Sequence, residues 1–192
     1  MLKYTLEEAK HIWVTSDTHF NHVNIIKYCN RPFSSVKEMN GIIINNWNNV
    51  VSDNDVVYHL GDFALGDKSL IPNILEQLKG QKRLVLGNHD NINVMQDLFM
   101  SEYFESLGLE DIIRVGKTHI IMNHYPFASL PDSSTNVPII QLFGHVHSSP
   151  YKQWEGLVNQ YDIGVDNNNF TPVNLYEVIK KVKENVNTRV HK

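Results

Sequence analysis

Residues 16–26 read SDTHFNHVNII and bring Asp17, His19 and His22 within six positions of one another. The segment directly follows IWV, a short apolar run of residues that favour β-strands. A carboxylate and two imidazoles at the end of a buried strand are either ordinary polar turn residues or ligands for a metal ion. The choice between the two depends on whether other strand ends carry similar side chains.

Four further apolar runs end in the same kind of polar group. DVVYHLGD ends at Asp62, RLVLGNHD at Asn88, His89 and Asp90, HIIMNHYP at His124, and IIQLFGHVH at His145 and His147. A glycine precedes the polar group in three of the five runs, and glycine allows a sharp turn and a close backbone approach. Because ligands bind outside the carboxyl ends of strands in sheets with helical crossovers, we expect these side chains to converge on one edge.

The types of these side chains narrow the chemistry. Carboxylate, imidazole and amide oxygen, without thiolate, suit manganese, iron or zinc ions in sites that retain water. Seven or eight such ligands are too many for one ion but suit two. Two ions about 3.5–4 Å apart are a common device for phosphoryl displacement. The pattern therefore indicates a two-metal centre that acts on phosphate esters.

The segments between these strand ends alternate helix and strand. A helix over residues 23–30 is expected to stop before the Arg31-Pro pair, because proline disfavours helix at the preceding residue. Ser35 and Glu38 form a capping box for a second helix. Its apolar residues recur at three- and four-residue steps: Val36, Met39, Ile43, Trp47 and Val50. SLIPNILEQLKG predicts a helix ending at Gly80, and VMQDLFMSEYF predicts another.

In the C-terminal part of the chain, a hairpin of two strands interrupts the alternation of helix and strand. Residues 111–126 predict two strands joined by a tight turn at 115–118, and YDIGVDNN predicts the last strand. Asn174 and Glu177 are the capping pair of a helix that starts at Leu175. Helical crossovers followed by a hairpin predict an α/β fold in which two mixed β-sheets pack together with helices outside.

The composition and charge of the chain argue against several classes of protein. The chain has 192 residues and a formal net charge of -4, which argues against tight nonspecific binding to a nucleic acid backbone. Its lone cysteine, Cys29, excludes an internal disulfide and is expected to be a small buried residue on a helix. No signal peptide or run of membrane length is recognisable, so we expect a cytoplasmic protein without a membrane partner.

The ordered blocks DTH, GD, GNHD, NHYP and GHVH resemble the signature of the calcineurin-like metallophosphoesterase superfamily. The longer run DTHFNHVNIIKYCNRPF resembles small phage and bacterial phosphoesterases of that superfamily. The resemblance implies a single phosphoesterase domain over residues 1–192, built as a four-layer sandwich with two sheets flanked by helices. It also implies two divalent metal ions, for which manganese is expected and iron, zinc or nickel are alternatives.

The same resemblance implies roles for individual residues. The first metal would be held by Asp17, His19 and His147, the second by Asn88, His124 and His145, and Asp62 would bridge the two. In diesterase members of the superfamily, the histidine of the GNHD block contacts the phosphate and protonates the leaving oxygen, which is the role implied for His89. Asp90 would orient His89, or only cap a helix that begins near Asn91.

Several other residues keep two readings each. His22 either contacts a substrate phosphate or supports the metal loop. Arg31 either binds a phosphate through two of its N–H groups or pairs with a carboxylate. Tyr151 and Trp154 either stack on a nucleobase or close the core. His59 and His119 lie within strand patterns and are expected to be core or surface residues.

The leading hypothesis is a dinuclear phosphodiesterase in which a metal-held hydroxide attacks phosphorus and His89 protonates the leaving group. The expected substrate is a small phosphoester or nucleotide, with short oligonucleotides as a further option, and no protein partner is evident from the sequence. One alternative is a phosphomonoesterase acting on nucleotides or phosphoproteins. A second alternative is a catalytically silent binding scaffold with the same fold, as in the retromer subunit.

Overall fold

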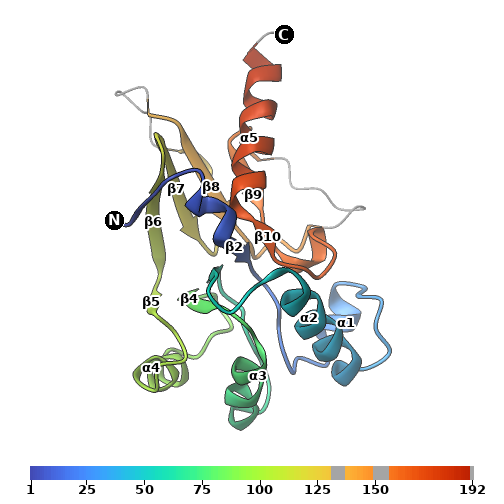
Figure 1. Cartoon of the computed structure of the whole chain (residues 1–192). Coiled ribbons are helices and arrows are strands. Elements are labelled where there is room, and N and C mark those ends of the chain that lie inside the picture. Colours follow the sequence, from blue (N-terminus) through green and yellow to red (C-terminus); the bar gives the residue numbers. More distant parts are fainter. Residues whose placement is uncertain (131–136, 149–155, 191–192) are drawn as a thin grey trace.

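The computed structural model describes residues 1–130, 137–148 and 156–190 and contains two five-stranded β-sheets (Figure 1). The β2 sheet has the order β10 (Val173–Asn174), β2 (Ile12–Thr15), β3 (Val56–His59), β4 (Gln81–Val85) and β5 (Ser106–Gly108). The β7 sheet has the order β1 (Lys3–Tyr4), β6 (Glu110–Val115), β7 (Thr118–Asn123), β8 (Ile139–Phe143) and β9 (Gln160–Asp162). Each sheet contains one antiparallel pair, β10 with β2 and β6 with β7, and its other pairs are parallel.

The helices of the described residues are η1 (Glu8–His11), α1 (Ile25–Tyr28), α2 (Val36–Val50), η2 (Lys68–Leu70), α3 (Ile71–Gln77), α4 (Ile92–Met100), η3 (Val165–Asn167) and α5 (Leu175–Val190). Helices α1 to α4 lie in the connections between the parallel strands β2, β3, β4 and β5, and α5 follows the last strand. In Figure 1, α3 and α4 lie at one end of the molecule and α5 extends from the other. The predicted α/β fold, with two mixed sheets flanked by helices, is confirmed.

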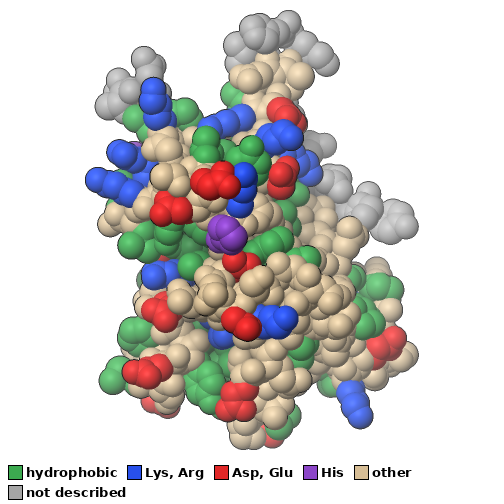
Figure 2. Space-filling view, in the orientation of Figure 1, with side chains coloured by type: hydrophobic (Ala, Val, Ile, Leu, Met, Phe, Trp, Pro, Cys, Tyr) green, Lys and Arg blue, Asp and Glu red, His purple; other side chains and the backbone are tan. Residues whose placement is uncertain are grey.

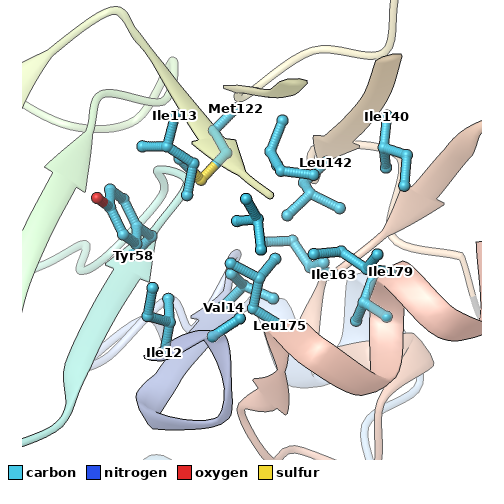
Figure 3. Packing of buried hydrophobic residues seen from close by; sticks show 14 of the residues in the cluster. Ile12, Val14, Tyr58, Ile113, Met122, Ile140, Leu142, Ile163, Leu175 and Ile179 are labelled. Atoms are coloured by element: carbon cyan, nitrogen blue, oxygen red, sulfur yellow. The ribbon is translucent and has the colours of Figure 1, made fainter. Parts of the chain in front are cut away.

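One hydrophobic cluster fills the space between the two sheets, and α5 packs into it (Figure 3). Ile12, Val14 and Tyr58 come from the β2 sheet, Ile113, Met122, Ile140 and Leu142 from the β7 sheet, and Leu175 and Ile179 from α5. All of these side chains are buried. Burial of apolar area contributes about 25 cal/mol per Å², so this shared core holds the two sheets in a fixed relation.

A second cluster joins α2, α3 and α4 to the other face of the β2 sheet. Met39, Ile43 and Trp47 of α2 are buried there, and Val36 and Val50 at the helix ends pack against the cluster while partly exposed. The apolar stripe predicted from the sequence is therefore confirmed.

The helix caps agree with the sequence only in part. Ser35 accepts a hydrogen bond from the Glu38 N–H at 3.2 Å, as a capping residue should. The Glu38 carboxylate, however, accepts from the N–H of Ser34 at 2.7 Å and so reaches one residue further back than expected. At α5, Asn174 accepts from the Tyr176 N–H at 3.1 Å.

Three local expectations were wrong. Helix α1 is only Ile25–Tyr28, shorter than the predicted span. Helix α3 ends at Gln77 because Leu78 is extended, and Gly80, with a φ of +83°, turns the chain into β4. The strand at YDIGVDNN is only Gln160–Asp162 and is not the last, because β10 follows it. The strands β1, β5 and β10 were not predicted, since two or three residues are too few to show a periodic pattern.

Charged side chains of both signs are interspersed over the face shown in Figure 2, and the described part of that face has no broad basic area. None of the helices described for this chain combines the length and the apolar character that crossing a bilayer requires.

Candidate metal centre

The carboxyl ends of β2, β3 and β4 meet those of β7, β8 and β9. An isolated parallel bridge between Ser16 and Gly164 connects the two sheets at this point. The Val165 N–H donates to the Ser16 carbonyl at 3.1 Å. The His145 N–H donates to Asp17 Oδ2 at 2.9 Å, which ties the loop after β8 to the loop after β2. The predicted convergence of strand ends therefore occurs across both sheets.

Asp17, His19 and His147 form one group, in which the candidate ligand atoms all lie within 4.8 Å of one another. Asp17 and His19 are buried, and Nε2 of His147 lies 4.0 Å from Asp17 Oδ1. Nε2 of His19 is buried without a hydrogen-bond partner. A buried nitrogen without a partner is costly, and a bound cation would satisfy it.

His124, His145 and Asn88 form a second group around the amide oxygen of Asn88. Nε2 of His124 lies 3.0 Å from this oxygen, and Nδ1 of His145 lies 2.9 Å from it. Nδ1 of His124 faces the Leu60 carbonyl at 2.8 Å, so Nδ1 carries the proton and Nε2 keeps its lone pair. A lone pair and an amide oxygen that face each other fit a cation placed between them.

Asp62 lies between the two groups. Its Oδ2 atom is 3.4 Å from Nε2 of His19 and 3.6 Å from Nε2 of His124. Asp62 also forms a potential metal-binding group with Asp17 and His124. One carboxylate oxygen therefore faces a candidate ligand of each group, which is the position that a bridging carboxylate needs.

The backbone around these side chains is strained. Positive φ angles occur at Asp17, His19, Asp62, His145 and His147. Such angles cost a non-glycine residue of the order of 1–2 kcal/mol each and are concentrated at functional sites. A Cβ atom on Gly87 would overlap Asp62 Oδ1, and one on Gly144 would overlap Asp17 Oδ2. Glycine at these two positions therefore lets the ligand loops pack against each other.

The pKa values in the first group shift in different directions. Burial raises the pKa of Asp17 to about 6. Burial opposes the charged form of His147, but the hydrogen bonds to Asp166 and Cys29 and the charges of Asp17 and Asp166 together outweigh burial and raise the pKa of His147 to about 10. Burial, followed by the charge of His147, lowers the pKa of His19. A desolvated carboxylate beside a neutral imidazole is a suitable environment for a divalent cation.

His89 lies at the exposed rim of the two groups. Its ring centroid is 5.4 Å from that of His19, and its backbone N–H donates to Asp62 Oδ1 at 2.8 Å. Within the described ranges of the chain, neither ring nitrogen of His89 has a hydrogen-bond partner. The ring is therefore free to contact a ligand that approaches the candidate metal groups.

Asp90 makes contacts other than the two predicted for it, with backbone N–H groups of two loops. Its carboxylate accepts from the backbone N–H groups of Asp62 at 2.8 Å, Phe63 at 2.9 Å and Gly87 at 2.8 Å. Helix α4 is capped by Asn91, which accepts from the Val94 N–H at 3.3 Å. Asp90 therefore fastens the loop after β3 to the loop after β4, and no hydrogen bond joins it to the ring of His89 among the described residues.

His22 precedes α1 and lies beside His19, with 3.2 Å between their Nδ1 atoms. Arg31 is buried and pairs with Asp166, so of its two predicted roles the structure shows the ion pair with a carboxylate. Tyr151 and Trp154 lie outside the described residues.

Two residues at the centre were not recognised from the sequence. Asp166 contacts Arg31 and His147, and it follows the run YDIGV much as the other site residues follow their strands. Cys29 is only partly buried, contrary to expectation, and forms a close group with His147 and Asp166. His59 is buried and hydrogen-bonds to Thr18, as expected for a core residue.

The fold and the two groups of side chains define the class of this protein, an α/β protein with a candidate divalent-metal centre at its sheet ends. The model of the calcineurin-like phosphoesterase family matches residues 10–170. The chain therefore belongs to the calcineurin-like phosphoesterase family, whose members typically bind divalent metals.

Three relatives show how far the similarity extends. An uncharacterized protein of Methanocaldococcus jannaschii is 36% identical over 183 residues, which cover 90% of this chain and 92% of that protein. The gene 66 protein of Mycobacterium phage L5 is 28% identical over 178 residues, covering 80% and 86% respectively. The crystal structure of a protein of unknown function from Aquifex aeolicus superposes with a TM-score of 0.68 at 29% identity, covering 88% and 97%.

Proposed function

We propose that this protein hydrolyses phosphodiesters of small, nucleotide-type substrates at a centre of two divalent ions, with His89 as the proton donor. Asp17, His19 and His147 would hold the first ion, Asn88, His124 and His145 the second, and Asp62 both. Ions held there would supply a nucleophile at neutral pH and neutralise charge on the phosphate. The donor set suits manganese, and also iron, zinc or nickel.

The observation that carries the diester proposal is the place of His89. Its ring is exposed next to His19 and His22, and it belongs to neither group of candidate ligands. An imidazole at this rim can hydrogen-bond to a phosphate ester and deliver a proton to the departing oxygen. An alkoxide leaves poorly without a proton, and general acid catalysis contributes about 10²–10⁴-fold to such a step.

The charge of the chain supports a small substrate. The net charge is -4, and charges of both signs are interspersed on the face in Figure 2. Long nucleic acids need extended basic surfaces because their affinity comes mainly from phosphate contacts. A mononucleotide, a dinucleotide or another small phosphoester, or at most a short oligonucleotide, fits this protein better.

The test compares hydrolysis of bis(p-nitrophenyl) phosphate and p-nitrophenyl phosphate by the wild-type protein with manganese and by His89→Ala. We expect the variant to keep its metal content and to lose about 10²–10⁴-fold in kcat on the diester. His119→Ala is the matched control, since His119 lies at the start of β7, opposite the end that leads to His124. Undiminished diester turnover by His89→Ala would contradict the role of His89.

The same comparison addresses the alternatives. Faster hydrolysis of the monoester by the wild-type protein would identify a phosphomonoesterase instead. A purified protein that binds no metal and shows no manganese-stimulated hydrolysis would favour a binding scaffold. The complete set of donors at both groups argues against the scaffold.

A further inference from the structure

Arg31 connects the loop that carries Asp17 to Asp166, the residue that contacts His147. Its side chain is fully buried, and its N–H groups all face protein acceptors. Nε donates to Asp166 Oδ1 at 2.8 Å. Nη1 donates to the Thr18 carbonyl at 3.0 Å and to Met39 Sδ at 3.5 Å. Nη2 donates to the Asp17 carbonyl at 2.7 Å and to Asp166 Oδ2 at 2.8 Å. The guanidinium therefore holds the backbone at Asp17 and the carboxylate of Asp166 in one rigid arrangement.

Asp166 passes this arrangement on to His147. The distance from Asp166 Oδ2 to Nδ1 of His147 is 2.8 Å, so Nδ1 carries the proton and donates it to the carboxylate. A metal ion bound to the other ring nitrogen, Nε2, would replace the second proton of the ring, and this nitrogen lies 4.0 Å from Asp17 Oδ1. The contact fixes both the tautomer of His147 and the direction in which Nε2 points.

We propose that Arg31 and Asp166 are a pair of positioning residues for the first metal. Asp166 orients His147, and Arg31 orients Asp166 together with the loop that carries Asp17. The proposal rests on the proposed function only for the place of the first ion. Partners that orient a metal-binding histidine in this way typically change metal affinity by about 10–100-fold when they are removed.

The second group is held differently. Nδ1 of His124 faces a neutral acceptor, the Leu60 carbonyl at 2.8 Å. The Leu60 carbonyl is not a partner of the Arg31 guanidinium, which bonds to Asp17, Thr18 and Asp166 beside the first group and to Met39 of α2. Loss of the Arg31–Asp166 pair should therefore weaken the first site and spare the second, whereas a role in general stability would affect both alike.

The charges of Arg31 and Asp166 also affect the first metal group more than the second. The carboxylate of Asp166 neutralises the guanidinium of Arg31 next to the place where a dication would bind. In Asp166→Asn, Arg31 would stand uncompensated there, and the new amide would present N–H groups either to Arg31 or to Nδ1–H of His147. Both changes act against a cation in the first group.

The experiment measures Mn²⁺ binding to wild-type protein and Asp166→Asn by calorimetric titration and electron paramagnetic resonance. We expect the wild type to bind two ions with the spectrum of a coupled pair. Asp166→Asn should lose about 10–100-fold in affinity at one site, keep the other affinity, and show the spectrum of an isolated Mn²⁺ ion.

Two further variants separate positioning from folding. Arg31→Lys keeps the charge but cannot span Asp166 and two carbonyls, so it should show a smaller loss at the same site. Asp55→Asn removes another buried carboxylate at the opposite end of the β2 sheet and should leave both affinities unchanged. If Asp166→Asn does not fold, Arg31→Lys carries the test.

Unchanged affinity at both sites in Asp166→Asn and Arg31→Lys would overturn the proposal. So would a parallel loss at both sites that follows the loss of stability and also appears in Asp55→Asn. The experiment measures metal binding and not hydrolysis. Its result can therefore be interpreted even if the protein does not hydrolyse phosphodiesters.

Discussion

Nδ1 of His19 lies 3.2 Å from Nδ1 of His22, while Nε2 of His19 is buried without a hydrogen-bond partner, 3.4 Å from Asp62 Oδ2. If Nε2 of His19 binds a metal, its proton is on Nδ1 and is donated to His22. His22 must then be neutral at Nδ1. Burial, followed by the charge of His89, lowers the pKa of His22, which favours this neutral form.

His22→Ala should therefore lower the affinity for the first metal by about 10–100-fold, because His19 loses the acceptor that fixes its tautomer. His22→Asn places an amide oxygen near the former Nδ1 position and should recover much of the affinity. Metal titration of both variants is the measurement. If His22→Ala raises the Michaelis constant on a diester with metal binding unchanged, His22 instead contacts the substrate phosphate.

Asp62→Asn should weaken both metals at once, because Oδ2 of Asp62 faces His19 of one group and His124 of the other. The amide keeps the shape of the side chain but removes the negative charge that would offset two dications. Metal analysis after dialysis checks the loss, with Asp17→Asn as the comparison that should affect only the first metal. Two ions retained by Asp62→Asn would show that Asp62 is not shared.

Asp90→Ala should destabilise the protein by about 3–5 kcal/mol, since three backbone N–H groups in the ligand loops lose their acceptor. Chemical denaturation measures the change. The control is Asp97→Ala on the exposed face of α4, which should stay within about 0.5 kcal/mol of the wild type. A variant that keeps its stability but loses turnover would instead support orientation of His89 by Asp90.

The candidate ligands that the sequence predicted share one local signal. Asp17, Asp62 and His124 each follow an apolar run, and topology alone brings the carboxyl ends of parallel strands to one edge. A short sequence window is enough to see such a run. The helix α2 was predictable for the same reason, because its buried residues repeat within fifteen positions.

What the sequence did not reveal depends on contacts between distant residues. Arg31 and Asp166 are 135 positions apart, and only the folded chain shows that the guanidinium is fully engaged and not free for phosphate. The positive φ angles at Asp17 and His145 likewise come from the packing of one loop against another. The contacts of Asp90 were not predicted, because its carboxylate accepts from backbone N–H groups. Every residue except proline has such a group, so the sequence does not show which ones a carboxylate will meet.

Asp55 provides a pH-dependent contribution to stability away from the metal groups. Burial raises its pKa, but the Ser52 N–H and the side chains of His11 and Trp13 outweigh burial, so the pKa in the folded protein lies below the usual value. Between the folded and unfolded pKa values the unfolded chain binds more protons, so stability rises with pH there. The contribution is therefore complete at neutral pH and is lost as the pH falls below about 4.

Asp55→Asn should lower the free energy of unfolding at pH 7 by about 1–3 kcal/mol, because an amide N–H would face the donors of Ser52 or Trp13. The difference from the wild type should shrink toward pH 3. Urea denaturation at a series of pH values measures it, with the exposed neighbour Asp53→Asn as the control for charge. A difference that is constant with pH would mean that Asp55 does not act through its ionised form.

Gly144 and Gly41 allow the packing of the ligand loops to be tested with the same substitution. A Cβ on Gly144 would overlap Asp17 Oδ2 and Ser16 Oγ, whereas a Cβ on Gly41, in α2, would meet nothing within 4 Å. Gly144→Ala should therefore displace Asp17, cost about 1–3 kcal/mol of stability and weaken the first metal. Gly41→Ala should stabilise the protein by about 0.5–1 kcal/mol, because alanine is the better helix former.

Denaturation of the two alanine variants should give stability changes of opposite sign if the loop after β8 packs on Asp17 as the structure shows, and metal titration should show a loss for Gly144→Ala alone. Gly144→Ala should weaken both metals, because Asp17 belongs to the first group and His145, the residue after Gly144, is a candidate ligand of the second. Wild-type stability and metal affinity in Gly144→Ala would show that the His145 N–H does not hold the Asp17 carboxylate in place. The first metal group would then be assembled by Arg31 and Asp166 alone, without a contribution from the close approach at Gly144.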